Sequence, residues 1–214
     1  MEPFTYLSAI AVPIDEANVD TNQLCPTRFN KIPRGPSHAK ILFHDRRFNP
    51  DGTEKEHILN VEPFSKARIV VADRNWGCGS SRESAVYALY EFGIRCVIAS
   101  SFGDIHANNC AKNGLLPVTL SQEDVIELRQ QLHDKPGATI SVDLAQQTVT
   151  GPNGKRYRFD IHPVRKKCLL GGLDDIARTQ QYDKQMAAFE AAYRSERPWL
   201  FNTPTATAPS LAVP

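Results

Sequence analysis

The residues whose types and spacing best suit chemistry form one short segment, GCGSSRE, at positions 77–83. It follows the β-branched run 69–72 and precedes apolar residues at helical spacing, which predicts a tight turn that opens a helix. Glycines let a backbone approach a ligand, and the N–H groups and dipole of a helix start attract negative charge. The hydroxyls of Ser80 and Ser81 and the guanidinium of Arg82 add donors for a carboxylate or phosphate. The segment is therefore predicted to bind an anion.

A purely structural role would account for the same residues. In this structural interpretation, Ser80 or Ser81 caps the helix. Glu83 or Ser84 then supports the first turn, and Arg82 is a solvated charge. The seven residues alone leave both interpretations open.

The elements that must hold this turn alternate between strands and helices. Strands are predicted at 6–12, where Pro13 ends the strand, and at 69–72, 96–99 and 115–120; helices are predicted at 84–92, 104–112 and 121–133, the last capped by Ser121. This order indicates an α/β layer with a largely parallel sheet. Two alternating runs, 139–144 and 156–161, bracket a turn at 151–154 and predict antiparallel strands. With further helices near 163–170 and 183–194, we expect one domain over 1–201 and a disordered tail over 202–214.

Composition narrows the class of protein. The chain has 214 residues and a formal net charge of +1, so whole-chain charge gives no case for nucleic acid or an anionic membrane as partner. Its five cysteines form no CxxC pair or Cys/His cluster, so no metal or iron–sulfur site is expected on this chain. Neither a secretory leader nor an apolar run long enough to span a membrane is visible. A cytoplasmic protein with reduced thiols is expected.

A basic segment, 26–40, carries several cations among prolines and a glycine. These cations are Arg28, Lys31, Arg34, His38 and Lys40. The segment is too broken for a helix, and a long irregular loop is often functional. An ordinary solvated loop is the alternative.

Four segments in fixed order resemble motifs of one protein family. Asn18-Val19-Asp20-Thr21-Asn22 resembles the N-V-D-T-D box of the small subunit of 3-isopropylmalate dehydratase, and 77–83 matches that family's G-C-G-S-S-R-E. Residues 101–105 and 113–118 resemble its S-F-x-D-I and N-x-L-L-P-V motifs, and 168–176 its C-L-L-N-G-L-D-D-I. The resemblance extends over roughly 4–192. It implies the swivelling β/β/α domain of the aconitase superfamily, a mixed, mostly parallel sheet flanked by helices with additional antiparallel strands.

The resemblance also implies an activity. Enzymes of this family are hydro-lyases that interconvert 2- and 3-isopropylmalate in leucine biosynthesis by removing and re-adding water. The [4Fe–4S] cluster belongs to a large subunit, so this chain is expected to bind no cofactor and to be active only in that complex. By carry-over, Ser80 is the general base, and Ser81 and Arg82 bind a carboxylate of the dicarboxylate substrate. Arg28 or Arg34 is expected to supply a second clamp.

Other residues of the matched motifs are expected to shape the site rather than to react. They are Asp20, Thr21, Asn22, Gly77, Cys78 and Gly79. For Asp20 and Thr21, a simple turn that positions the loop is an equally good interpretation.

The chain departs from the family pattern at several positions. Asn22 stands where the second aspartate of the box is usual, Ser84 replaces a histidine, and Gly171 replaces an asparagine. Cys25, in an unusual sequence beside the box, is expected near the site. These changes leave open a related dehydratase for 2-methylmalate and citraconate or another small hydroxy acid, and a non-catalytic anion-binding module. A serine hydrolase is disfavoured because no G-x-S-x-G motif is present.

Overall fold

The computed structural model describes residues 1–201 and divides into two units. The first unit is Met1–Asp174, and the second begins at Asp175. The predicted domain, 1–201, includes the described part of both units. The predicted tail, 202–214, lies outside the described residues.

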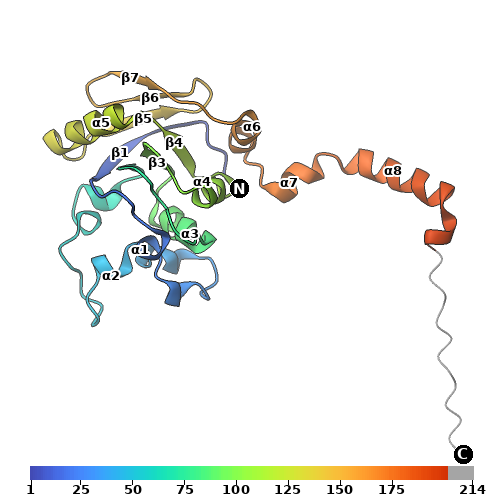
Figure 1. Cartoon of the computed structure of the whole chain (residues 1–214), viewed down its shortest axis with the longest axis horizontal. Coiled ribbons are helices and arrows are strands. Elements are labelled where there is room, and N and C mark those ends of the chain that lie inside the picture. The colour runs from blue at the N-terminus through green and yellow to red at the C-terminus, as the bar shows by residue number, and fades with distance from the viewer. Residues whose placement is uncertain (202–214) are drawn as a thin grey trace, which may run out of the picture. The chain divides into compact units, whose positions relative to one another are not determined.

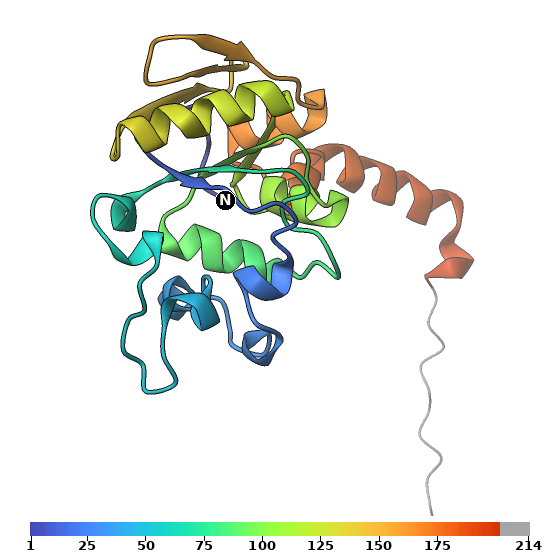
Figure 2. The same cartoon turned by 60° about the vertical axis from the view of Figure 1, so that its left-hand side comes forward.

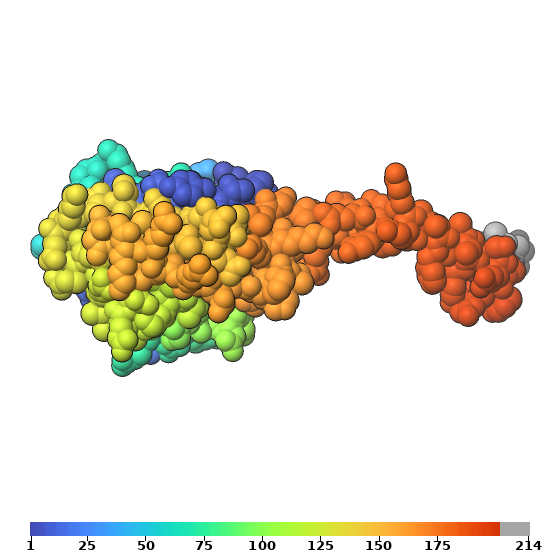
Figure 3. All heavy atoms as spheres, turned by 90° about the horizontal axis from the view of Figure 1, so that it is seen from above, coloured from blue at the N-terminus to red at the C-terminus, as the bar shows by residue number. Residues whose placement is uncertain are grey.

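The first unit is built on a mixed sheet with strand order β4-β3-β2-β1-β5-β6-β7 (Figure 1). Four strands are parallel: β1 (Tyr6–Ile14), β2 (Ile69–Ala72), β3 (Cys96–Ala99) and β4 (Leu116–Thr119). The antiparallel strands β5 (Thr139–Asp143), β6 (Thr148–Thr150) and β7 (Arg156–Arg158) extend the sheet from β1. The outer strands β6 and β7 face the viewer in Figure 3. The predicted fold class, a parallel α/β layer with added antiparallel strands, is confirmed.

The pairing of the antiparallel strands differs from the prediction. The sequence suggested two runs, 139–144 and 156–161, on either side of one turn. In the structure β6 lies between them, because Val149 pairs with Val142 of β5 and with Tyr157 of β7. Three residues are too few to show an alternating pattern, so the sequence did not reveal this strand.

β1 continues through Pro13, where the sequence predicted its end. Successive N–H groups of a strand point to opposite sides. The N–H of Ala11 donates to Ala138 on the β5 side at 3.2 Å, so the nitrogen of Pro13 faces that side too. Pairing with β5 ends where Ile10 meets Thr139. The hydrogen that proline lacks is therefore not needed there.

Helices cover both faces of the sheet and bury two apolar cores. In Figure 2, α3 (Glu83–Phe92, green) and α5 (Gln122–Asp134, yellow-green) lie on opposite sides of the strands. Alternate strand residues face the two cores: Val70 belongs to the same core as Leu89 of α3, whereas Val71 belongs to the same core as Leu128 of α5. The remaining helices of this unit are α1 (Thr21–Leu24), α2 (His44–Arg47), α4 (Asp104–Lys112) and α6 (Pro163–Gly171).

The basic segment forms short 3-10 turns rather than an open loop. They are η1 (Thr27–Phe29) and η2 (Pro36–Lys40), and two more, η3 (Ile58–Asn60) and η4 (Phe64–Lys66), follow before β2. Arg47 holds this region together. Its Nη1 donates to the carbonyls of Ala39 (3.0 Å) and Leu42 (3.1 Å), and its Nε donates to Asn60 Oδ1 (2.8 Å).

The second unit consists of α7 (Asp175–Gln180), α8 (Asp183–Glu196) and the turn η5 (Pro198–Leu200). No residue of these three elements is buried. Large apolar side chains such as Phe189 and Trp199 are exposed. None of the helices in residues 1–201 is long and apolar enough to cross a membrane.

Candidate active site

The 77–83 segment lies where three loops meet at the carboxyl ends of the parallel strands. In the loop after β1, Asp20 pairs with Cys78 of the segment. In the loop after β3, Phe102 pairs with Trp76, the residue directly before the segment. The N–H of Gly77 donates to the carbonyl of Val19 at 2.7 Å. Three of the four motifs that were far apart in the sequence therefore form one site.

The backbone of the segment requires glycine. Gly77 and Gly79 have φ of 71° and 84°, a region that L side chains rarely adopt. A Cβ on Gly103, from the loop after β3, would lie 2.6 Å from the carbonyl oxygen of Gly77. The two loops therefore approach each other closely enough to exclude a side chain at that point.

Helix α3 begins at Glu83, and Arg82 occupies its cap position. Arg82 has extended backbone angles, φ −119° and ψ 147°, and no side chain caps this helix. The alternative interpretation, in which Ser80 or Ser81 caps the helix, is therefore wrong. The helix starts too late for their side chains to take that role, which leaves both hydroxyls for other contacts.

Ser80, Ser81 and Arg82 differ in their surroundings. Ser80 is exposed, and its backbone is held because Thr21 Oγ1 donates to its carbonyl at 3.4 Å. The hydroxyl of Ser81 is buried and has no hydrogen-bond partner within residues 1–201. Arg82 is exposed and forms no ion pair with any residue that the structure describes. The segment thus presents an exposed serine two positions before an exposed arginine that has no ion-pair partner in residues 1–201.

A small pocket of about 220 Å³ lies under the segment, lined by Gly77, Gly79, Ser81, Gly103, Asp104, Ile105 and His106. His106, on α4, is fully buried, and neither ring nitrogen has a partner in the described part of the chain. Burial lowers the pKa of His106 to about 4, so its ring is neutral at pH 7. His106 could not be predicted from the sequence, because a single histidine in a helix carries no recognisable signal.

The box at 18–22 acts as a structural support in this chain. Asp20 caps α1 by accepting a hydrogen bond from the N–H of Gln23 at 2.8 Å. The N–H of Thr21 donates to the carbonyl of Cys78 at 3.2 Å. Asn22 accepts a hydrogen bond from the hydroxyl of Thr27 at 2.6 Å, which directs its side chain toward η1.

The two arginines proposed as a second clamp have other partners in the isolated chain. Arg28 forms an exposed ion pair with Asp45, whose pKa this arginine lowers to about 2. Arg34 donates to Asn113 Oδ1 at 3.0 Å, and Asn113 in turn donates to Glu83 at 3.1 Å. Arg34 is thus linked through Asn113 to Glu83, the first residue of α3. A role for either arginine in binding substrate stays a prediction.

Two departures from the family pattern meet behind the site. The hydroxyl of Ser84 donates to Asn30 Oδ1 at 2.7 Å, and Cys25 Sγ lies 4.0 Å from the same oxygen. Cys25 is buried, and burial raises the pKa of its thiol. A protonated, buried thiol packs as a small apolar group.

Comparison with known proteins gives a consistent result. The Aconitase C-terminal domain family matches residues 1–123, and LeuD_N matches residues 127–163. A 3-isopropylmalate dehydratase small subunit from Paramagnetospirillum magneticum is 46% identical over 94% of this chain and 100% of its own length. The chain belongs to the family of 3-isopropylmalate dehydratase small subunits. The small subunit from Jannaschia sp. has the same identity and coverage, and that from Xanthobacter autotrophicus is 44% identical.

A solved structure supports the fold of this dehydratase small-subunit chain. The 3-isopropylmalate dehydratase LeuD from Methanocaldococcus jannaschii has a TM-score of 0.65 over 86% of this chain and 98% of its own, at 21% identity. This likeness confirms the predicted fold, and the match to the Aconitase C-terminal domain family shows that it is of the aconitase type. Within residues 1–201, no group of three or more His, Cys, Asp or Glu side chains could hold a metal ion.

Proposed function

We propose that this chain is the small subunit of a 3-isopropylmalate dehydratase, a hydro-lyase that interconverts 2- and 3-isopropylmalate in the cytoplasm during leucine biosynthesis. Family membership over nearly the whole chain supports the activity. One structural observation carries the assignment of the site: the exposed Ser80 lies two positions before Arg82, which is also exposed and has no ion-pair partner in residues 1–201, where three motif-bearing loops meet. The chain is proposed to act with a large subunit, as the name of its relatives implies.

Ser80 is proposed to take the substrate proton as general base. A serine hydroxyl is too weakly acidic to do this in water, so nearby positive charge must stabilise its anion. Arg82 and the positive end of the α3 dipole, two and three positions after Ser80, supply that charge. The hydrogen bond from Thr21 to the carbonyl of Ser80 holds the backbone and leaves the side chain exposed.

Ser81 and Arg82 are proposed to bind a substrate carboxylate. A guanidinium can grip a carboxylate through two parallel hydrogen bonds. The buried hydroxyl of Ser81 lacks a partner among residues 1–201, so it can donate to a ligand without breaking a bond within the chain. Both groups also stabilise charge that develops on the carboxylate as the proton leaves.

The metal chemistry is proposed to come from the other chain. In this family a [4Fe–4S] cluster acts as Lewis acid on the leaving hydroxyl. The described residues of this chain do not fit such a cluster, because they contain no group of three or more suitable ligands, and Cys25, Cys96 and Cys110 are buried free thiols. We therefore assign to this chain only proton transfer and carboxylate binding.

A substrate panel tests the proposal. The chain is co-purified with an anaerobically reconstituted large subunit and assayed for hydration of isopropylmaleate and of citraconate. The names of the relatives favour isopropylmaleate. A clear preference for citraconate would assign the chain to a related dehydratase, the alternative suggested by Asn22.

The role of Ser80 is tested by Ser80→Ala in the same complex. Removing a general base is expected to lower kcat by about 10²- to 10⁴-fold. Ser8→Ala, which removes an exposed serine of β1 bonded to Ser141, is the control and should leave turnover unchanged. Full turnover in the Ser80 variant would favour a non-catalytic module.

A further inference from the structure

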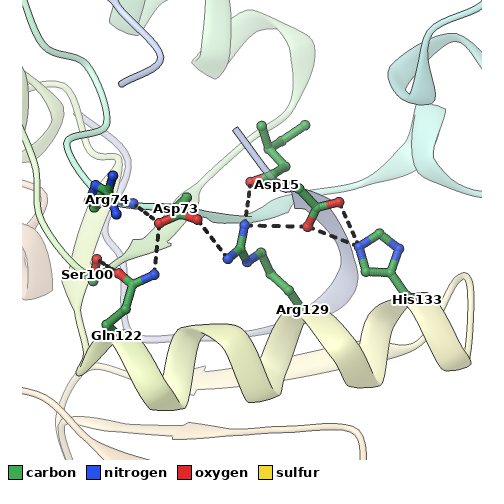
Figure 4. A network of polar contacts seen from close by, with 8 residues as sticks. Asp15, Asp73, Arg74, Ser100, Gln122, Arg129 and His133 are labelled. Atoms are coloured by element: carbon green, nitrogen blue, oxygen red, sulfur yellow. Dashed lines mark hydrogen bonds and ion pairs between the residues drawn. The ribbon is translucent and has the colours of Figure 1, made fainter. Parts of the chain in front are cut away.

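One helix contacts the exits of the three strands whose loops form the site. Asp15 follows β1, Asp73 follows β2, and Ser100 follows β3. Their partners, His133, Arg129 and Gln122, all come from α5 (Figure 4). These helix positions are separated by seven and four residues, so they lie on one face of α5.

The contacts form a continuous network. Arg129 Nη2 donates to Asp73 Oδ2 at 2.9 Å, and Gln122 Nε2 donates to Asp73 Oδ1 at 2.9 Å. Ser100 donates to the amide oxygen of Gln122. Arg129 Nη1 lies 3.4 Å from Asp15 Oδ1, and His133 Nε2 lies 2.9 Å from Asp15 Oδ2. Figure 4 shows Arg129 between the two aspartates.

The centre of the network is buried. The side chains of Arg129 and Asp73 are only 10% and 15% exposed. Burying a charged pair costs much of what the pair gains, so such a pair is weak evidence of stabilisation for its own sake. The strands are already held by their ladders of backbone hydrogen bonds. What the pair adds is a defined position of the strand ends relative to α5.

The network continues into the site through three successive residues. Asp73 Oδ1 accepts a hydrogen bond from the N–H of Arg74 at 2.6 Å, and the carbonyl of Arg74 accepts one from the N–H of Asn18 at 3.0 Å. The N–H of Asn75 donates to Ser101 Oγ at 2.8 Å, and its amide donates to Asn18 Oδ1 at 2.8 Å. The next residues are Trp76 and Gly77. A few hydrogen bonds thus connect Asp73 to all three loops, so the position of Asp73 constrains the position of each loop.

We propose that Arg129 is a positioning residue for the dehydratase reaction, because it fixes Asp73 and thereby the three loops that place Ser80. The inference rests on the proposed function. A misplacement of about 1 Å at a reacting group can cost up to about 100-fold in rate, so a contact remote from the substrate can control turnover.

The test uses the reconstituted complex with its large subunit. Arg129→Met removes the charge and the hydrogen bonds and keeps most of the apolar stem. It is expected to lower kcat by about tenfold or more and to raise KM by a smaller factor, because Ser81 and Arg82 are still present although they lie on the same segment as Ser80. Arg129→Lys keeps a cation for Asp73 and should restore part of the lost rate.

Two controls separate positioning from loss of stability. Lys155→Met breaks exposed ion pairs with Glu127 and Asp124 on the same helix, and should leave kcat unchanged. Val149→Ala creates a cavity in β6 and lowers stability without touching the network, and should also keep kcat. The two variants are compared at the same melting temperature. If Val149→Ala then loses as much kcat as Arg129→Met, the loss of rate comes from lower stability alone and the inference is wrong.

A milder variant covers the case in which Arg129→Met does not fold. Gln122→Ala leaves the ion pair in place and removes the contacts to Asp73 and Ser100, and it should lower kcat by about threefold to tenfold. Unchanged kcat in folded Arg129→Met, or in Gln122→Ala where Arg129→Met does not fold, would overturn the inference. An inactive wild-type complex would instead contradict the proposed function.

Discussion

The ring of His106 lies directly against Gly77. A Cβ built at Gly77 would be 2.2 Å from Cδ2 of this histidine and 2.3 Å from Cγ. The imidazole thus forms the floor under the start of the 77–83 segment. Because His106 is a buried residue of α4, the segment and the ring cannot both stay in place if position 77 gains a side chain.

Gly77→Ala is predicted to disrupt the site. The substitution places a side chain at φ 71°, which costs about 1–2 kcal/mol, and adds the clash with His106. We expect a total loss of stability above about 2 kcal/mol and a large loss of activity in the complex. Gly154→Ala is the matched control, because its φ is 84° and nothing lies within 4 Å of the added Cβ. Equal stability of the two variants in urea would contradict the clash.

His106 is predicted to make the protein sensitive to acid. Burial lowers its folded-state pKa to about 4, from an ordinary value of 6.5. The unfolded chain therefore takes up a proton at a higher pH than the folded chain does. The neutral His106 ring therefore contributes to the free energy of unfolding. This contribution is fully present above pH 6.5 and is lost as the pH falls toward 4, by about 3 kcal/mol in total.

His106→Phe tests this pH dependence. A phenyl ring keeps the floor under Gly77 and removes two buried nitrogens that have no partner in residues 1–201. We expect equal or higher stability at pH 7 and a smaller loss between pH 6.5 and 4, measured by urea unfolding at several pH values. The same pH slope in both proteins would show that His106 is not the sensing group.

The two loop arginines are predicted to contribute unequally to substrate binding. Arg34 reaches the start of α3 through Asn113 and Glu83, whereas Arg28 is held in a surface ion pair with Asp45. Arg34→Ala is therefore expected to raise KM in the complex by about tenfold, the scale of one charged hydrogen bond, and Arg28→Ala by less. A larger effect of Arg28 would mean that the loop rearranges in the complex.

Arg47 is predicted to hold the region between β1 and β2 in place. It is 7% exposed and donates to two carbonyls and to Asn60. Arg47→Met leaves these acceptors without partners and should cost about 3 kcal/mol. Arg46→Met, which removes the exposed pair with Glu16, should cost under about 1 kcal/mol. Limited proteolysis within residues 26–60 provides a second measurement.

Much of the fold could be predicted because its main elements carry strong local patterns. The β-branched runs of β2 and β3 and the cap of Ser121 on α5 were found at or near their observed positions. The short elements α1, α2 and β6 were missed because three or four residues show no period.

The site was only partly visible in the sequence. The 77–83 segment could be found because its glycines, hydroxyls and arginine are adjacent in the chain. His106 and Arg129 could not, because their roles depend on what packs against them after folding. One signal existed for Arg129: Gln122, Arg129 and His133 recur on one side of α5, and a polar residue directly follows each of the three facing strands.

The meeting of three loops at the strand ends has a consequence for folding. The hydrogen bonds that join them connect residues far apart in the chain: Asn18 with Asn75 across 57 positions, and Thr21 with Ser80 across 59. Closing loops of this length costs entropy that isolated contacts do not repay. The parallel strands must pair before these bonds become favourable, so the ability to react is acquired at a late step of folding, after the sheet itself.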